Sequence, residues 1–84
     1  MTFTYTARID IMPRPEILDP QGKATLRGLK NLGFEGMDEV KIGRRIELQV
    51  KAADKAAAEI IVKEACRKLL ANTVTEVFSF EIGY

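Results

Sequence analysis

The sequence contains no histidine, no tryptophan and only one cysteine in 84 residues. Without histidine, neither a Ser–His–Asp nor a Cys–His arrangement can form, and a zinc site lacks its usual ligands. Cys66 has no second cysteine to pair with, and it lies in a helical pattern. We therefore expect an inert, half-buried thiol at Cys66, and we predict no catalytic, cofactor-binding or metal-binding residues.

Charge of one sign is also lacking. Thirteen Lys and Arg residues stand against twelve Asp and Glu residues, for a formal charge of +1. Nucleic-acid binding needs a clustered cationic surplus, so no nucleic-acid partner is expected. The nearest basic patch is Lys41, Arg44 and Arg45, which we interpret as a solvated hairpin, with anion contact as the alternative. Asp10 and Glu81 could meet across strands, and we interpret them as solvated surface charges.

Long hydrophobic runs are absent, because the longest are three residues, such as Ile60-Ile61-Val62. This is far short of a membrane span, and residues 1–5 lack the features of a signal peptide. We expect a cytoplasmic protein without a membrane partner. The length predicts one domain, residues 1–84.

Alternation of apolar and polar residues predicts a strand over Phe3–Met12, ended by Pro13-Arg14-Pro15. Asp19 directly before Pro20 is typical of a helix start, with Asp19 as N-cap and Pro20 in the first turn. An apolar stripe follows, and Gly33 is suited to end the helix in a left-handed conformation.

Residues 37–50 have a strand-like pattern interrupted by Gly43. We expect a hairpin there, with positive φ at Gly43, and one long bent strand is the alternative. Asp54 begins a second predicted helix that extends through Ala71. Its expected core stripe is Ala58, Ile61, Ala65 and Leu69. Residues 74–84 alternate again and predict the last strand.

The predicted order is β-α-β-β-α-β, an α+β fold with a ferredoxin-like antiparallel sheet and both helices on one face. We expect large side chains on the other face, and a face or edge of this kind favours self-association.

Four blocks resemble the PurS family, the small subunit of phosphoribosylformylglycinamidine (FGAM) synthase, in order and spacing. They are Leu18-Asp19-Pro20-Gln21-Gly22, Leu29-Lys30-Asn31-Leu32-Gly33-Phe34, Ile42-Gly43-Arg44 and Leu70-Ala71-Asn72. The similarity extends roughly from Phe3 to Phe80.

The resemblance implies an assembly subunit in purine biosynthesis with no activity alone. It would join a synthetase subunit (PurL) and a glutaminase subunit (PurQ), and the complex would use ATP, Mg and glutamine to convert FGAR to FGAM. It also implies a homodimer or homotetramer, with no cofactor bound by this chain. A ferredoxin-like module that senses a small metabolite as a dimer is the alternative.

Helix initiation explains Asp19 and Pro20, but it does not explain Gln21 and Gly22, since glycine in a first turn lowers helix stability. We expect a partner backbone to approach there. Leu70 lies off the expected apolar stripe, and Asn72 fits a helix end. The candidate partner contacts are therefore Asp19, Pro20, Gln21, Gly22, Gly43, Arg44, Leu70 and Asn72.

Overall fold

A computed structural model describes all 84 residues as three strands and two α-helices, the second of which continues into a π-helical turn. In chain order the elements are β1 (Phe3–Pro13), α1 (Pro20–Asn31), β2 (Arg44–Ala52), α2 (Lys55–Ala65), the π-helical turn η1 (Cys66–Leu70) and β3 (Glu76–Gly83). The predicted α+β class is confirmed. No helix combines the length and apolar character that a membrane crossing requires.

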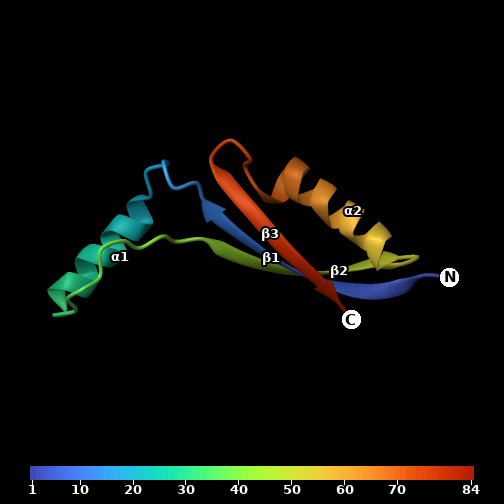
Figure 1. Cartoon of the computed structure of the whole chain (residues 1–84), viewed down its shortest axis with the longest axis horizontal. Coiled ribbons are helices and arrows are strands. Elements are labelled where there is room, and N and C mark those ends of the chain that lie inside the picture. Colours follow the sequence, from blue (N-terminus) through green and yellow to red (C-terminus); the bar gives the residue numbers. More distant parts are fainter.

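The sheet has the order β2-β1-β3, and both pairings are antiparallel. The central strand β1 places Ile9 opposite Ile46 on one side and opposite Phe80 on the other. Cross-strand partners share a face of the sheet, so the apolar positions of all three strands lie on the same side. Helix α2 packs on this side (Figure 1).

The core is thin, with 11 of the 84 residues buried. Ala7, Ile9 and Ile11 of β1 meet Val62 and Cys66 of the helix, and all five are fully buried. Cys66 was expected to be half-buried, and the structure corrects this because its thiol faces the sheet. Burial raises the pKa of the Cys66 thiol, which keeps it protonated and unreactive at neutral pH.

The opposite face of the sheet is polar, contrary to the expectation of large side chains there. Arg45 lies within 3.7 Å of Asp10 and 3.4 Å of Glu81, and Arg8 lies 3.8 Å from Glu47. Asp10 and Glu81 are thus two ends of an exposed ion-pair network around one guanidinium. The strand register decides this outcome, because it places the alternating polar residues of all three strands on the same face of the sheet.

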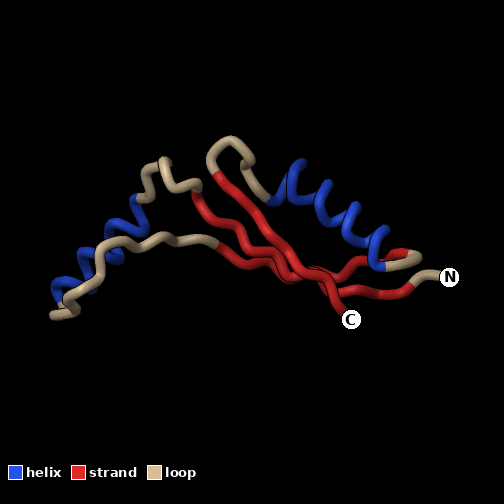
Figure 2. The backbone as a smooth tube through the Cα atoms, viewed as in Figure 1, coloured by secondary structure: helices blue, strands red, loops and turns tan.

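The predicted hairpin over residues 37–50 is wrong. Residues 37–43 are extended but pair with no strand, and β2 is a single strand that starts at Arg44 (Figure 2). Gly43 does not adopt positive φ. A Cβ at Gly43 would collide with the carbonyl oxygen of Ile11 and the sulfur of Met12. Close packing on β1, rather than a turn, therefore explains this glycine.

Helix α1 does not cover the sheet, so the expectation of two helices on one face is also wrong. It projects away from the sheet beside the extended 37–42 segment, and together residues 14–43 form what we call the arm (Figure 1). The radius of gyration is 16.6 Å, against about 12 Å for a compact chain of this length. Gly33, with φ of 93°, ends α1 as predicted.

The π-helical turn changes which leucine faces the core. The residues of the helix that are fully buried are Ala58, Val62 and Cys66, whereas Ile61 is half exposed and Leu69 is 83 % exposed. A π-turn takes more residues than an α-turn, so Leu70 rotates inward and packs on the core while Leu69 rotates out. The stripe predicted through Ile61 and Leu69 is wrong, as is the placement of Leu70 off the apolar face.

Candidate functional site

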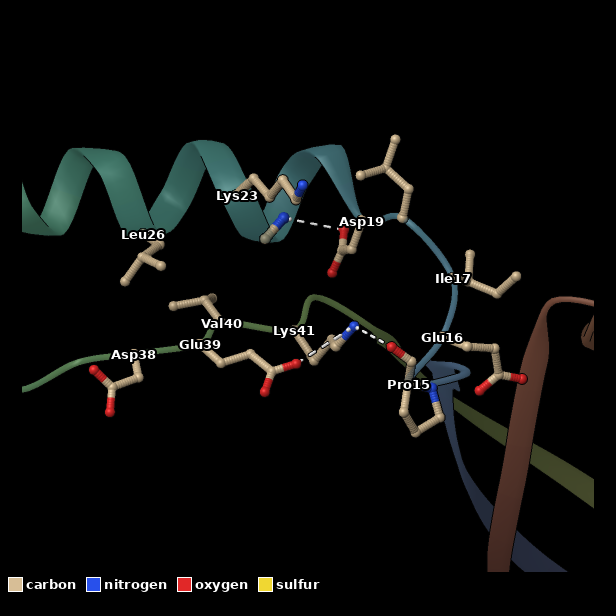
Figure 3. A pocket seen from close by; sticks show the side chains of 12 residues that line it. Pro15, Glu16, Ile17, Asp19, Lys23, Leu26, Asp38, Glu39, Val40 and Lys41 are labelled. Carbon is tan, nitrogen blue, oxygen red and sulfur yellow. Dashed lines mark hydrogen bonds and ion pairs between the residues drawn. The ribbon is translucent and has the colours of Figure 1, made fainter.

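The arm is held at its base by the carboxylate of Asp19. Its Oδ1 accepts a hydrogen bond from the Gly22 amide at 3.0 Å, which is the predicted N-cap, and Pro20 occupies the first position of α1. Its Oδ2 accepts from the Ile42 amide at 2.9 Å. One side chain therefore both starts the helix and ties the extended segment to it. Figure 3 shows the first of these two hydrogen bonds.

Gly22 is buried because the arm's own backbone approaches it. A Cβ at this position would collide with the carbonyl oxygen of Val40. The close approach inferred from the sequence is real, but the approaching backbone belongs to this chain. Gly22 thus stays a predicted partner contact, but the need for glycine at this position is explained by Val40 rather than by a partner.

Pro20 and Gln21 are exposed at the same helix start. The backbone carbonyl of Gln21 accepts a hydrogen bond from the Thr25 hydroxyl at 2.8 Å, while its side-chain amide bonds to no other residue of the chain. Within the Asp-Pro-Gln-Gly block, Gln21 is therefore the residue whose side chain is free for a partner.

A cavity of about 410 Å³ opens between the loop 15–19, the first turns of α1 and the segment 38–41 (Figure 3). It is lined by both signs of charge, with Glu16, Asp38 and Glu39 against Lys23 and Lys41. The Lys41 ammonium already contacts the Pro15 carbonyl oxygen at 3.3 Å and the Glu39 carboxylate at 3.6 Å. Its mixed charges suit a polar protein surface better than a single charged ligand.

A second cluster gathers three other predicted contacts at the end of the sheet where β1 ends and β2 begins. Arg44 donates two hydrogen bonds to Glu76, at 2.6 and 3.1 Å, and one to the carbonyl oxygen of Leu70 at 2.6 Å. Glu76 in turn accepts from the Asn72 amide at 2.8 Å. Arg44, Leu70 and Asn72 are therefore brought together, whereas the Asp19 block lies apart on the arm.

Sequence reasoning missed Glu76, although the pattern carried a signal. Glu76 lies two residues before Phe78 in β3, so it is on the same face of the sheet as Phe78 and Phe80. Arg44 likewise lies on the same face as Ile46 and Leu48 of β2. A charged residue at the end of each strand, on the same face, suggests an ion pair. Arg14, which donates to the Thr73 carbonyl oxygen at 2.7 Å, gave no such signal.

The candidate basic patch is not a patch in the fold. Lys41 pairs with Glu39, Arg44 with Glu76, and Arg45 with Asp10 and Glu81. Each cation is thus partly neutralised, and the hairpin expected to hold the three together does not form. No three His, Cys, Asp or Glu side chains gather as a metal-binding group.

Hydrogen bonding lowers two carboxyl pKa values at these clusters. The backbone amides of Ile42 and Gly22 hold the pKa of Asp19 below its ordinary range. The Arg44 guanidinium, aided by the Asn72 amide, lowers the pKa of Glu76, and the same pairing raises the pKa of Arg44. Both carboxylates are therefore charged at neutral pH, which is the form these contacts require.

Two glycines in α1 allow a matched test of the arm. Gly22→Ala should weaken the arm by about 1–3 kcal/mol, because the new methyl group meets the Val40 carbonyl oxygen. Gly28→Ala meets no atom within 4 Å and should stabilise α1 by about 0.5–1 kcal/mol. Amide hydrogen exchange at Ile42, measured by NMR, should accelerate only in Gly22→Ala. Equal protection in both variants would contradict the packing described.

The Arg44–Glu76 cluster should make stability depend on pH. The pKa of Glu76 lies below its unfolded value of about 4.3, so the folded chain binds fewer protons near that pH. Its stabilisation is complete above the unfolded pKa and is lost as pH falls through the folded pKa. Glu76→Gln should therefore lower the free energy of unfolding at pH 7 and flatten its decline between pH 5 and 3 in urea titrations. Glu59→Gln, at an exposed position of α2 without an ion pair, is the control and should leave the profile unchanged.

Comparison with known proteins assigns this chain to a family. Residues 6–83 match the family model "PurS: Phosphoribosylformylglycinamidine (FGAM) synthase". The chain is 45 % identical over 82 residues to the phosphoribosylformylglycinamidine synthase subunit PurS of Synechocystis sp., covering 98 % of this chain and 82 % of that one.

Solved structures agree. The PurS subunit of Thermotoga maritima superposes with a TM-score of 0.89 at 30 % identity, covering 99 % of this chain and 95 % of that chain. A chain in the structure of PurLQS from T. maritima gives 0.87 at 31 %, covering 95 % and 98 %. These matches do not favour the metabolite-sensing alternative. The chain belongs to the PurS family, the PurS subunits of FGAM synthase in purine biosynthesis.

Proposed function

We propose that this chain is a non-catalytic assembly subunit that joins the glutaminase PurQ to the ATP-dependent synthetase PurL. In this role it would let ammonia from glutamine convert FGAR to FGAM, while ATP, Mg and glutamine are bound by the other subunits. The similarity to a chain of a PurLQS structure supports the two partners. The lack of histidine in the sequence supports a role without chemistry of its own.

The observation that carries the proposal is the arm. A chain that acted alone would be expected to fold α1 onto its sheet and enlarge its thin core, since burial of apolar surface is the main driving force of folding. Here α1 projects away, so that Leu32, Phe34 and Met37 are exposed near its tip. An element that projects from the domain, and whose two segments are joined by the hydrogen bonds of Asp19, is suited to contact other chains.

The arm also supports a homodimer or homotetramer. Residues 37–43 are extended, and their backbone makes no hydrogen bond to other backbone in this chain. The Ile42 amide donates to Asp19, and the other backbone amides and carbonyls of this segment have no partner in the chain. A strand-like segment of this kind is a template for pairing with a second copy. The near-neutral charge and the paired basic side chains do not favour a nucleic-acid or membrane partner. We place the assembly in the cytoplasm, where purine biosynthesis takes place.

Reconstitution with purified synthetase and glutaminase from the same organism tests the joining role. FGAM formation from glutamine should require this chain, whereas formation from added ammonia should not, because ammonia bypasses the glutaminase. If the synthetase used glutamine equally well without this chain, the proposed role would be wrong.

Light scattering coupled to size-exclusion chromatography tests self-association. The wild-type chain should have the mass of a dimer or tetramer, and Leu32→Ser/Phe34→Ser should shift the equilibrium toward the monomer by removing apolar contact at the arm tip. Ile60→Ser, on the outer side of α2 and 66 % exposed, is the matched control and should keep the wild-type mass. A monomeric wild-type chain at micromolar concentration would refute this part of the proposal.

A further inference from the structure

Two strongly exposed apolar residues flank the start of the bend that leads from η1 into β3: Leu69 lies in η1, and Val74 lies in the loop before β3. Figure 1 shows the course of this bend. Leu69 is 83 % exposed and Val74 is 79 % exposed, more than any other large apolar residue except those at the two termini. Isolated exposed apolar residues need no explanation. Leu69 and Val74, however, are only five positions apart in the sequence, and both lie outside the arm.

The helix geometry itself turns Leu69 outward. Continuation of α2 as a regular α-helix would place residue 69 three positions after the buried Cys66, on the same face. The π-turn η1 instead sends Leu70 inward and leaves Leu69 in solvent. Single π-turns are uncommon and occur frequently at functional sites.

One backbone hydrogen bond and three that involve side chains fix the bend in place. Arg14 donates its amide to the Thr75 carbonyl oxygen at 2.9 Å and its guanidinium to the Thr73 carbonyl oxygen at 2.7 Å. Arg44 donates to the Leu70 carbonyl oxygen, and the Asn72 side chain accepts from the Val74 amide at 3.1 Å. A preorganised bend costs less conformational entropy on binding than a free loop.

The charges around the bend are mostly positive. Glu64 is shared by Arg67 at 2.6 Å and Lys68 at 3.5 Å, so one carboxylate serves two cations. Lys63 and Arg14 have no carboxylate within ion-pair distance, whereas Arg44 at the base of the bend is paired with Glu76. Glu16 in the 14–16 loop is the remaining acidic residue. Five cations against three anions leave a net charge of +2.

This charge argues against two copies meeting through the bend. A two-fold interface brings the same patch of both chains together, so Arg67 and Lys68 would face their own counterparts. Like charges across an interface are unfavourable, whereas opposite charges favour association. The complementary surface is therefore an apolar pocket rimmed by Asp or Glu on a different protein.

We propose that Leu69 and Val74, rimmed by Arg14, Arg67 and Lys68, form a docking surface for an acidic-rimmed apolar pocket on another subunit of FGAM synthase. We call these five residues the shoulder. The inference rests on the proposed joining function, and it adds the shoulder to the arm as a surface for contact with the other subunits.

Binding of the purified chain to the synthetase and glutaminase subunits, separately and together, tests the inference by fluorescence anisotropy. Leu69→Ser/Val74→Ser should raise the Kd for one of them by about tenfold or more, as expected for central apolar contacts. Arg67→Glu/Lys68→Glu should weaken the same binding and reduce its dependence on salt. Ile60→Ser and Lys51→Glu/Lys55→Glu are the controls of matched chemistry and should bind as wild type.

Circular dichroism and light scattering on each variant separate docking from folding and self-association. All four variants alter exposed side chains, so each chain should fold and keep the wild-type mass. Arg67→Glu/Lys68→Glu should show a small drop in melting temperature, because Glu64 then faces like charges. Wild-type affinity in both shoulder variants would overturn the inference and leave the proposed function standing. A changed oligomeric mass in the shoulder variants would also overturn it, since a second copy would then be the occupant. If the wild-type chain bound neither subunit, the joining function itself would fail, and this inference with it.

Discussion

One carboxylate determines the shape of this molecule outside its sheet. Asp19 satisfies a free amide at the start of α1 and the amide of Ile42 on the returning segment, so helix and segment form one arm. The arm has little core of its own, since Gly22 is the only buried residue of α1. Where few apolar contacts are available, two charge-assisted hydrogen bonds carry a large share of the local order.

The regular elements could largely be predicted from the sequence. Alternation located β1 and β3, and the caps at Asp19 and Asp54 gave both helix starts, because these signals are local. Residues 37–43 were predicted as a strand because their pattern is strand-like, but alternation alone does not determine whether a segment pairs with another strand. The end of the predicted α2 stripe at Leu69 failed because a π-turn has no distinct sequence pattern and shifts every later residue.

The candidate site was predicted as a set of residues but not as an arrangement. The resemblance to PurS chose Asp19, Gly22, Gly43, Arg44 and Asn72, and the fold gives each an intrachain role. Gly22 and Gly43 are glycines because backbone atoms of Val40 and Ile11 lie against them, a long-range fact that no local propensity contains. Family motifs here therefore describe the construction of the arm and of the bend, while Gln21 and Leu69 are exposed.

The separation of arm and sheet has a consequence for how changes combine. The arm joins the sheet only where β1 ends and where β2 begins, and α1 does not pack on the strands. Free-energy changes at sites without shared neighbours are additive. The free-energy changes of a substitution in the core beneath α2 and of one in the arm should accordingly add. Those of two substitutions that affect the same carboxylate, Asp19 or Glu76, should not add. The chain thus behaves energetically as two modules, although its sequence has the length of one domain.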